Sequence, residues 1–269
     1  MDATIKKQLE ITACKVRLGI IEGVFNAKSG HPGGSLSIAD MLTYLYFAKM
    51  NVYPDKPDEP SRDRFVLSKG HTAPALYSVL AEKGFFPKDE LKSLRHIGAL
   101  LQGHPCIHIP GVDMSSGSLG QGISAACGMA LSGKISNSTY KVYTVLGDGE
   151  IEEGQVWEAA MFAAHYKLDN LVAVVDNNGL QIDGKISDVM SPYPIKEKFE
   201  AFGWHAIEAA FNEAETVSGQ PVVIIQKSVK GKGVSFMENQ VGWHGTAPNK
   251  EQYDQAVSEL TAKLNELEG

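Results

Sequence analysis

The sequence predicts an α/β fold, a parallel sheet with helices on both faces, in a single domain over residues 1–269. Three runs are almost wholly apolar, as strands buried on both faces of a parallel sheet are: KVYTVL (141–146), NLVAVVD (170–176) and PVVIIQKSV (221–229). Segments with helical spacing of apolar residues alternate with these runs, which indicates parallel strand pairing. A length of 269 residues with 43% hydrophobic content is enough for one large core.

The first part of the chain predicts two helices. Apolar residues at helical spacing indicate a long helix over residues 3–27. The glycine-rich segment that follows is expected to lead into a second helix, capped by Ser35 or Ser37 and with Asp40 in its first turn.

The remaining elements follow from the same rules. RDRFVLSKGH (62–71) predicts a short buried strand that ends in a loop at His71, and Gly84 is expected to stop the helix that begins at residue 73. Further helices are expected over 88–95, 119–134, 154–168 and, as an amphipathic surface helix, about 249–267.

Composition and charge narrow the class of protein. The net charge of −7 argues against a nucleic-acid partner, although a local pocket can still bind phosphate. No run approaches 18 apolar residues, so no transmembrane helix is expected, and the N-terminal segment lacks the apolar core of a signal peptide. Three scattered cysteines are expected to be reduced thiols, which predicts a cytoplasmic protein.

The segment KVYTVLGDGEIEEG (141–154) places an aspartate in a glycine turn at the end of a strand. In an open parallel sheet, ligands bind beyond the carboxyl ends of the strands. Gly147 and Gly149 permit a tight turn and let backbone N–H groups approach an anion. The Asp148 carboxylate would repel a phosphate unless a divalent cation stood between them, and Mg²⁺ bridges carboxylates and phosphates in this way.

A second oxygen ligand is expected from the end of the next strand. There DNNGLQIDG (176–184) places Asn178 thirty residues after Asp148, and one strand–helix–strand unit brings both to the same edge of the sheet. Asn178 offers its amide oxygen, and Gly179 lets the chain turn the carbonyl of Leu180 toward the ion.

Two other interpretations of the turn stay open. A dinucleotide-binding turn would use the acid at Asp176, but the glycines run G-x-G-x-x-x-x-G rather than G-x-G-x-x-G. A G-D-G sequence alone is usually a plain structural turn, and the matched NN at the expected spacing is what favours a metal and diphosphate site.

Seven segments carry a family resemblance. They are SGHPGG (29–34), LSKGHTAPALY (67–77), GHP (103–105), PGVDMSSGSLGQGISAACGMA (110–130), GDGEIEEGQVWEAA (147–160), DNNGLQIDG (176–184) and WHGTAP (243–248). The span from GDG to NN is similar to the thiamine diphosphate-binding motif. All seven together, in this order and over nearly the whole chain, resemble the N-terminal region of transketolase.

The resemblance implies a cofactor, a metal and a partner. The cofactor is thiamine diphosphate, with Mg²⁺ or Ca²⁺ held by Asp148, Asn178 and the Leu180 carbonyl. A full-length transketolase has a second domain that binds the aminopyrimidine and supplies a glutamate, and a third, C-terminal domain. This chain stops soon after WHGTAP. The resemblance therefore implies the N-terminal subunit of a split transketolase, completed by a C-terminal subunit in an α₂β₂ assembly that acts on sugar phosphates, with no nucleic acid and no membrane involved.

Four histidines match catalytic positions of the family. The resemblance implies that His31 and His244 lie near the C3 hydroxyl of the donor sugar, and that His104 hydrogen-bonds its C1 hydroxyl. His71 is expected near the diphosphate and the reacting centre. Histidine suits this proton transfer near neutral pH. The alternative is that they are ordinary loop residues, as is expected for the other four: His96, His108, His165 and His205.

Further cofactor contacts are implied by the resemblance, each with a structural alternative. Gly117 and Leu119 are expected at the aminopyrimidine side, or in tight helix packing. Ile182 is expected against the thiazolium, or in the core. Lys230 is expected at the diphosphate, or in solvent.

The full set of expected cofactor-binding residues is His71, Gly117, Leu119, Gly147, Asp148, Gly149, Glu153, Asn178, Ile182, Lys230 and His244. Glu153 and Glu158 are expected to face the partner chain, or to complement a helix N-terminus. The segment HPCIH (104–108) offers three potential zinc ligands within five residues, too close to complete a tetrahedron.

Rival functions remain within and outside this cofactor class. A deoxyxylulose-phosphate synthase, a 2-oxo-acid dehydrogenase subunit or a transketolase for a sulfonated or branched sugar would use the same turn. A non-catalytic cofactor-binding remnant would not need all four histidines.

Overall fold

The computed structural model describes residues 1–208, 214 and 216–269. It contains two compact units. The helical unit comprises residues 1–58, 71–111 and 229–269, and the sheet unit comprises residues 59–70 and 112–228. None of the described helices is long and apolar enough to cross a lipid bilayer.

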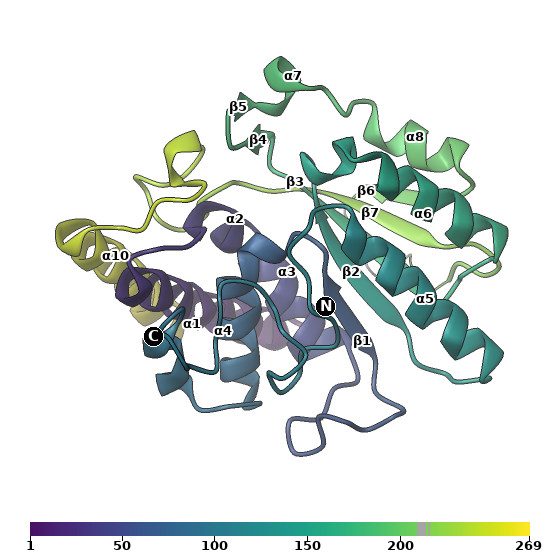
Figure 1. Cartoon of the computed structure of the whole chain (residues 1–269). Coiled ribbons are helices and arrows are strands. Elements are labelled where there is room, and N and C mark those ends of the chain that lie inside the picture. Colours follow the sequence, from purple (N-terminus) through teal and green to yellow (C-terminus); the bar gives the residue numbers. More distant parts are fainter. Residues whose placement is uncertain (209–213, 215) are drawn as a thin grey trace. The chain divides into compact units, whose positions relative to one another are not determined.

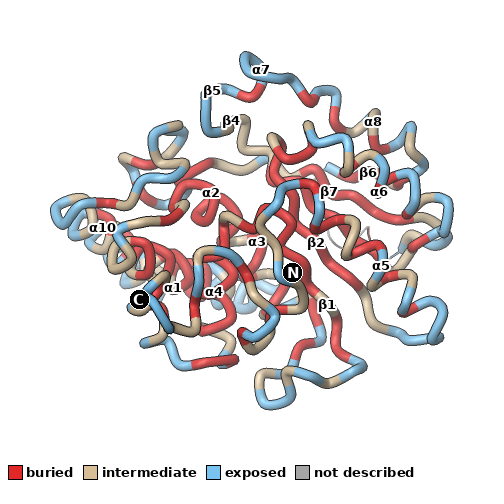
Figure 2. Tube along the Cα trace, viewed as in Figure 1, coloured by how far each residue is buried: buried red, intermediate tan, exposed pale blue. Residues whose placement is uncertain are grey.

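The sheet unit is built on a parallel sheet of five described strands in the order β1-β2-β3-β7-β6. The strands are β1 (Arg64–Leu67), β2 (Val142–Gly147), β3 (Leu171–Asn177), β7 (Val222–Lys227) and β6 (His205–Glu208). Strands β2, β3 and β7 are buried along nearly their whole length, as their apolar sequences require (Figure 2). In the β2–β3 register Gly147 lies opposite Asp176, so the two polar strand ends share one edge.

Helices α5, α6 and α8 cover one face of this sheet (Figure 1). The helical elements of the unit are α5 (Gln121–Ile135), the 3₁₀ turn η4 (Glu150–Glu152), α6 (Gly154–His165), α7 (Ile186–Val189) and α8 (Ile195–Ala201). A short antiparallel ribbon joins β4 (Leu180–Gln181) to β5 (Gly184–Lys185).

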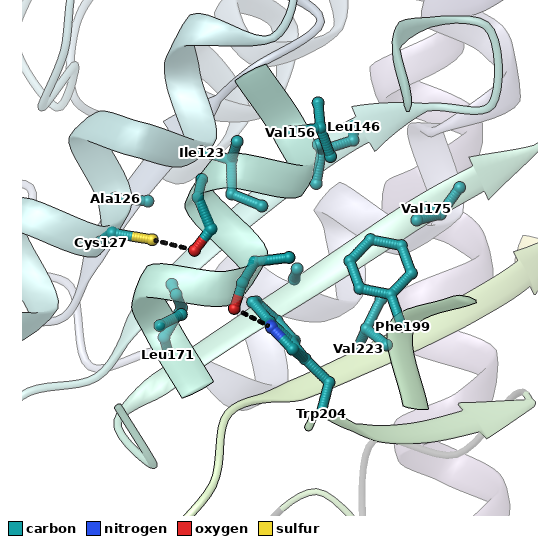
Figure 3. Packing of buried hydrophobic residues seen from close by; sticks show 14 of the residues in the cluster. Ile123, Ala126, Cys127, Leu146, Val156, Leu171, Val175, Phe199, Trp204 and Val223 are labelled. Carbon is teal, nitrogen blue, oxygen red and sulfur yellow. Dashed lines mark hydrogen bonds between the residues drawn. The ribbon is translucent and has the colours of Figure 1, made fainter. Parts of the chain in front are cut away.

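The core between these helices and the sheet is formed, on the strand side, by every second residue, because alternate side chains of a strand point to the same face (Figure 3). Leu146, Val175 and Val223 face Val156 of α6 and Phe199 of α8. Small residues such as Ala126 and Ala160 let α5 and α6 approach the strands closely, which explains their glycine- and alanine-rich sequences.

The helical unit is built around α1 (Ala3–Ala27), which packs against α3, α4 and α10. Its other elements are α2 (Pro32–Ser37), α3 (Ala39–Tyr44), the π-helical turn η1 (Leu45–Lys49), η2 (Gly70–Thr72, whose glycine belongs to the sheet unit), α4 (Ala73–Lys83), η3 (Lys88–Ser93), η5 (Val241–Trp243) and α10 (Lys250–Glu268). Asn249 caps α10 in a capping box with Gln252.

Most of the predicted elements are present, and the parallel sheet with helices is confirmed. Helix α4 ends at Gly84, whose φ of 98° is left-handed, as predicted. The expected caps Ser35 and Ser37 are wrong, because both lie inside α2, which Pro32 starts. The helix with Asp40 in its first turn, as predicted, is α3, and its N-cap is Ile38.

Three further differences concern local structure. The segment expected as a helix over 88–95 forms a 3₁₀ helix, and strand β6 and helix α8 were not predicted. Strand β6 is four residues long with polar ends, so it lacks the apolar run that identifies its neighbours.

Candidate active site

The glycine turn after β2 meets the end of β3 inside the sheet unit, as predicted. Asp148 Oδ2 accepts a hydrogen bond of 2.6 Å from the Gly179 backbone, and its Oδ1 accepts one of 3.0 Å from the Gly149 backbone. Asp148 is buried, and burial, with a smaller contribution from nearby Asp176, raises its pKa to about 6.

The expected metal ligands lie on these two strand ends. The Asn178 side-chain oxygen accepts from the Leu180 backbone at 3.1 Å, and its amide nitrogen donates to Asp176 at 3.0 Å. The donor set of one carboxylate, one amide oxygen and one backbone carbonyl consists only of oxygen, which fits a hard cation such as Mg²⁺. The residues present therefore fit a divalent metal beside a diphosphate.

Behind these ligands lies a buried ion pair that the sequence did not predict. Lys69, after β1, lies 2.6 Å from Asp176, at the end of β3, and both side chains are buried. Asp176 also accepts a hydrogen bond from the Ser228 hydroxyl. The carboxylate is thus surrounded by donors, and it fixes the side chain of Asn178 next to it.

Glu150 is a second buried carboxylate at the same edge. It accepts hydrogen bonds from the Ser68 hydroxyl and from the backbones of Gly120 and Gly147. Burial raises its pKa, against the opposing effect of these hydrogen bonds and of Lys69.

The loop that precedes α5 contains two predicted cofactor contacts, Gly117 and Leu119. A cavity of about 270 Å³ is lined by residues 114–118 together with Gln121 and Gly122. Leu119 is 37% exposed, so it is a surface residue of this chain and not part of its core.

Three of the four predicted catalytic histidines come together in the helical unit. The ring centroids of His31 and His71 are 5.1 Å apart, those of His31 and His244 are 5.5 Å apart, and those of His71 and His244 are 5.3 Å apart. His31 precedes α2, His71 lies in η2 and His244 follows η5, so segments distant in sequence bring the rings together. We call these three residues the histidine cluster.

A buried lysine joins the histidine cluster. Lys230 Nζ lies 2.9 Å from His244 Nδ1, and Lys230 is buried, against the alternative of a solvated lysine. An ammonium offers only donors, so Nδ1 accepts this hydrogen bond and neutral His244 carries its proton on Nε2. Gly33 makes room for this arrangement, because a Cβ there would lie 2.8 Å from the Trp243 carbonyl oxygen and 3.2 Å from Lys230.

His104 lies on a neighbouring loop of the same unit and is exposed. Its backbone carbonyl accepts from the Tyr77 hydroxyl at 2.7 Å. The guanidinium of Arg95 packs over Gly103, and a Cβ at that glycine would lie 3.1 Å from it.

The environment keeps His31 and His104 neutral at neutral pH. Burial lowers the pKa of His31 to about 4, and the positive charge of Arg95 contributes after burial. Burial and Arg95, in that order, also lower the pKa of His104. Neutral imidazoles at neutral pH can accept protons from hydroxyl groups.

The other predicted residues lie on the surface of the sheet unit. Glu153, the N-cap of α6, and Glu158 within that helix are exposed, and Ile182 is 60% exposed. The alternative of Ile182 as a core residue is therefore wrong. Among the described residues, no group of three or more His, Cys, Asp or Glu side chains is arranged to hold a metal, which also applies to the segment HPCIH.

Sequence reasoning missed Lys69, Glu150 and Arg95. Lys69 and Glu150 lie within the quoted motifs LSKGH and GDGE, but a charged residue in a loop is usually solvated, so nothing in the sequence marked them as buried. Arg95 lay in a segment expected to be a helix, whereas its φ of 63° places it beyond η3.

Comparisons with known proteins agree with this geometry. Residues 8–266 match the family model described as transketolase, thiamine diphosphate binding domain. The chain is 44% identical to one of the subunits of the apulose-4-phosphate transketolase of Phocaeicola vulgatus, over 97% of this chain and 96% of that one. It is 43% identical to the 6-deoxy-6-sulfo-D-fructose transketolase subunit SqwG of Clostridium sp. (strain MSTE9), over 94% of this chain and 96% of that one.

A solved structure gives the same result at the level of the fold. The transketolase of Campylobacter jejuni superposes with a TM-score of 0.89 at 30% identity. The match covers 97% of this chain and 43% of that one, so the chain spans less than half of that transketolase.

Proposed function

Because this chain belongs to the transketolase family, we propose that it is the thiamine diphosphate-binding subunit of a two-chain transketolase. It transfers a two-carbon ketol unit from a ketose phosphate to an aldose phosphate, together with a C-terminal subunit that supplies the remaining domains. The two relatives described above are themselves single subunits of transketolases, and this chain matches each over 96% of its length, which supports the two-chain arrangement. An α₂β₂ assembly in the cytoplasm is part of the proposal.

The sheet unit holds the diphosphate end of the cofactor in this proposal. Asp148, Asn178 and the Leu180 carbonyl bind Mg²⁺ or Ca²⁺, and the backbone of Gly147–Gly149 faces the diphosphate. The single observation that supports this assignment best is the meeting of Asp148 with the Gly179 backbone at 2.6 Å, which joins the two halves of the motif.

The loop contacts belong to the same proposal. Gly117 and Leu119 contact the aminopyrimidine side, Ile182 lies against the thiazolium, and Glu153 and Glu158 face the partner subunit. The exposure of Leu119 and Ile182 supports this, because apolar side chains at a ligand or partner site are exposed in the free chain.

Thiamine diphosphate, when bound, would supply the carbanion chemistry that the transfer of a two-carbon unit requires. In this proposal the histidine cluster accepts protons from, and donates hydrogen bonds to, the hydroxyl groups of the sugar. His31 is neutral at neutral pH because its pKa is lowered to about 4. As a neutral imidazole it accepts the proton of the donor C3 hydroxyl in this proposal.

His244 presents Nε2–H, because Lys230 occupies its Nδ1, and so it donates a hydrogen bond to the same hydroxyl oxygen. His104, exposed and neutral, hydrogen-bonds the C1 hydroxyl. His71 stands beside His31 and His244 and contributes to the cofactor site together with Lys230.

The sugar that the enzyme prefers is a separate question. Two of the similar subunits are named for apulose 4-phosphate and for 6-deoxy-6-sulfo-D-fructose. We therefore include branched and sulfonated sugars as candidate donors beside xylulose 5-phosphate.

The test is ketol transfer with thiamine diphosphate and Mg²⁺, measured for the chain alone and for the chain co-expressed with a C-terminal transketolase subunit. Xylulose 5-phosphate, apulose 4-phosphate and 6-deoxy-6-sulfofructose serve as donors. We expect activity only in the pair. Activity in the chain alone would contradict the need for a partner, and turnover of pyruvate would favour the rival enzymes of this cofactor class.

A further inference from the structure

Glu150 joins three segments of the sheet unit through one buried carboxylate. Its Oε1 accepts from the Ser68 hydroxyl, after β1, and from the Gly120 backbone at 3.0 Å. Its Oε2 accepts from the Gly147 backbone at 3.0 Å, at the end of β2. Only 2% of Glu150 is exposed, so water does not compete for these bonds.

Glycines hold the same segments in close contact. A Cβ at Gly122 would lie 2.5 Å from the Cα of Ser68, and a Cβ at Gly70 would lie 2.8 Å from the backbone nitrogen of Gly117. Gly120 has a φ of 81°, a left-handed conformation that favours glycine. At these two glycines the loop before α5 therefore lies against the end of β1 with no room for a Cβ.

Burial of the Glu150 carboxylate at this position costs desolvation free energy. An apolar side chain of similar volume would avoid the desolvation of a charge. Glu150 instead accepts hydrogen bonds from two backbone N–H groups and one hydroxyl, which come from three different segments. These hydrogen bonds indicate that the Glu150 carboxylate holds the three segments in a defined arrangement and does more than fill space.

We propose that Glu150 is a positioning residue that fixes the loop 117–120 and the turn Gly147–Gly149 to the end of β1 before any cofactor binds. This rests on the proposed function, in which the loop contacts the aminopyrimidine side of thiamine diphosphate and the turn faces its diphosphate. A loop that is ordered in advance costs less to immobilise when a ligand binds. Glu150 is buried and acts through the backbone N–H groups of both segments.

The first test is hydrogen–deuterium exchange of the full chain without cofactor. In Glu150→Gln the side chain keeps its size, but its amide group turns a donor toward one of the backbone N–H donors. We expect exchange to rise about tenfold or more in residues 114–122 and 146–151 together, since a hydrogen bond to a charged acceptor is lost. The matched control is Glu200→Gln, an exposed residue of α8, for which we expect the wild-type pattern.

A second variant keeps the test decisive if Glu150→Gln does not fold. Ser68→Ala removes one donor and leaves both backbone donors, and we expect a smaller rise in the same two segments. An unchanged pattern in the folded variants, or a rise in only one of the two segments, would overturn the proposal.

Binding distinguishes this proposal from the function on which it rests. Calorimetry of the two-chain complex with thiamine diphosphate and Mg²⁺ should show a dissociation constant about tenfold higher or more in Glu150→Gln, with kcat nearly unchanged at saturating cofactor. A loss in kcat alone would contradict a positioning role. If the wild-type complex does not bind thiamine diphosphate, the proposed function fails, and the exchange experiment still decides whether Glu150 orders the two segments.

Discussion

The Lys69 ammonium lies 2.6 Å from the Asp176 carboxylate at the carboxyl edge of the sheet, and both groups are buried. Asp176 in turn accepts from the amide nitrogen of Asn178, so the Asn178 oxygen is left for the Leu180 backbone or for a cation. The Lys69–Asp176 pair is not part of the proposed metal site, but it fixes the orientation of the Asn178 side chain, which is a proposed metal ligand.

Breaking this pair should be costly. Lys69→Met leaves the Asp176 carboxylate buried without its cation, and we expect a loss of about 3–5 kcal/mol in the free energy of unfolding. Urea denaturation of the full chain measures it. The matched control is Lys134→Met, whose partner Asp169 lies at a similar distance of 2.7 Å but at the surface. That change should cost at most about 1 kcal/mol, and equal losses in the two variants would contradict the assignment of a buried pair.

Metal and cofactor should stabilise the chain through Asp148. At a ligand concentration one hundred times the dissociation constant, we expect a gain of about 2.7 kcal/mol, seen as a rise in Tm on adding Mg²⁺ and thiamine diphosphate. Asp148→Ala should abolish the rise, because it removes the only carboxylate of the proposed ligand set, and EDTA should reverse it in the wild type. A rise that persists in Asp148→Ala would place the metal elsewhere.

The stability of the chain should depend on pH through His31. The unfolded chain takes up a proton at this residue below its ordinary pKa of 6.5, whereas the folded chain does so only near 4. The folded state is therefore disfavoured as the pH falls through this window. In His31→Asn we expect a shallower fall of Tm between these two pH values than in the wild type. The exposed His108→Asn is the control, and parallel curves for His31→Asn and the wild type would refute the depressed pKa.

His104 should matter for activity and not for stability. Its side chain is exposed, so His104→Ala should leave Tm within about 1 °C, since surface substitutions change stability little. We expect a loss of about 10²–10³-fold in kcat/KM of the two-chain enzyme if the imidazole stabilises the transition state. His108→Ala, on the same loop, should retain activity. Full activity in His104→Ala would remove it from the proposed site and favour a non-catalytic cofactor-binding protein.

The strands and the metal turn could be predicted because their signals are local. An apolar run between polar turns identifies β2, β3 and β7, and the thirty residues from Asp148 to Asn178 correspond to one strand–helix–strand unit. The structure places Asp148 and Asn178 on neighbouring strand ends for this reason.

What could not be predicted depends on contacts between distant segments. Lys69 and Asp176 are 107 residues apart, and Ser68 and Glu150 are 82 apart. No spacing rule pairs such residues, and a lysine in a loop is usually solvated. The prediction of Ser35 or Ser37 as a helix cap was wrong for another reason: Pro32 is a stronger signal for a helix start than either serine, and α2 begins there.

The glycines that bring the loop before α5 against β1 have a consequence for protein engineering. A Cβ at position 122 would lie 2.5 Å from the Cα of Ser68, so this loop can be exchanged alone only for one that keeps glycine at position 122. A transplanted loop with alanine at position 122 would push the end of β1 aside, and with it the neighbouring Lys69. An experiment that recombines this chain with a related enzyme should therefore transfer the loop before α5 and the end of β1 together, or leave both unchanged.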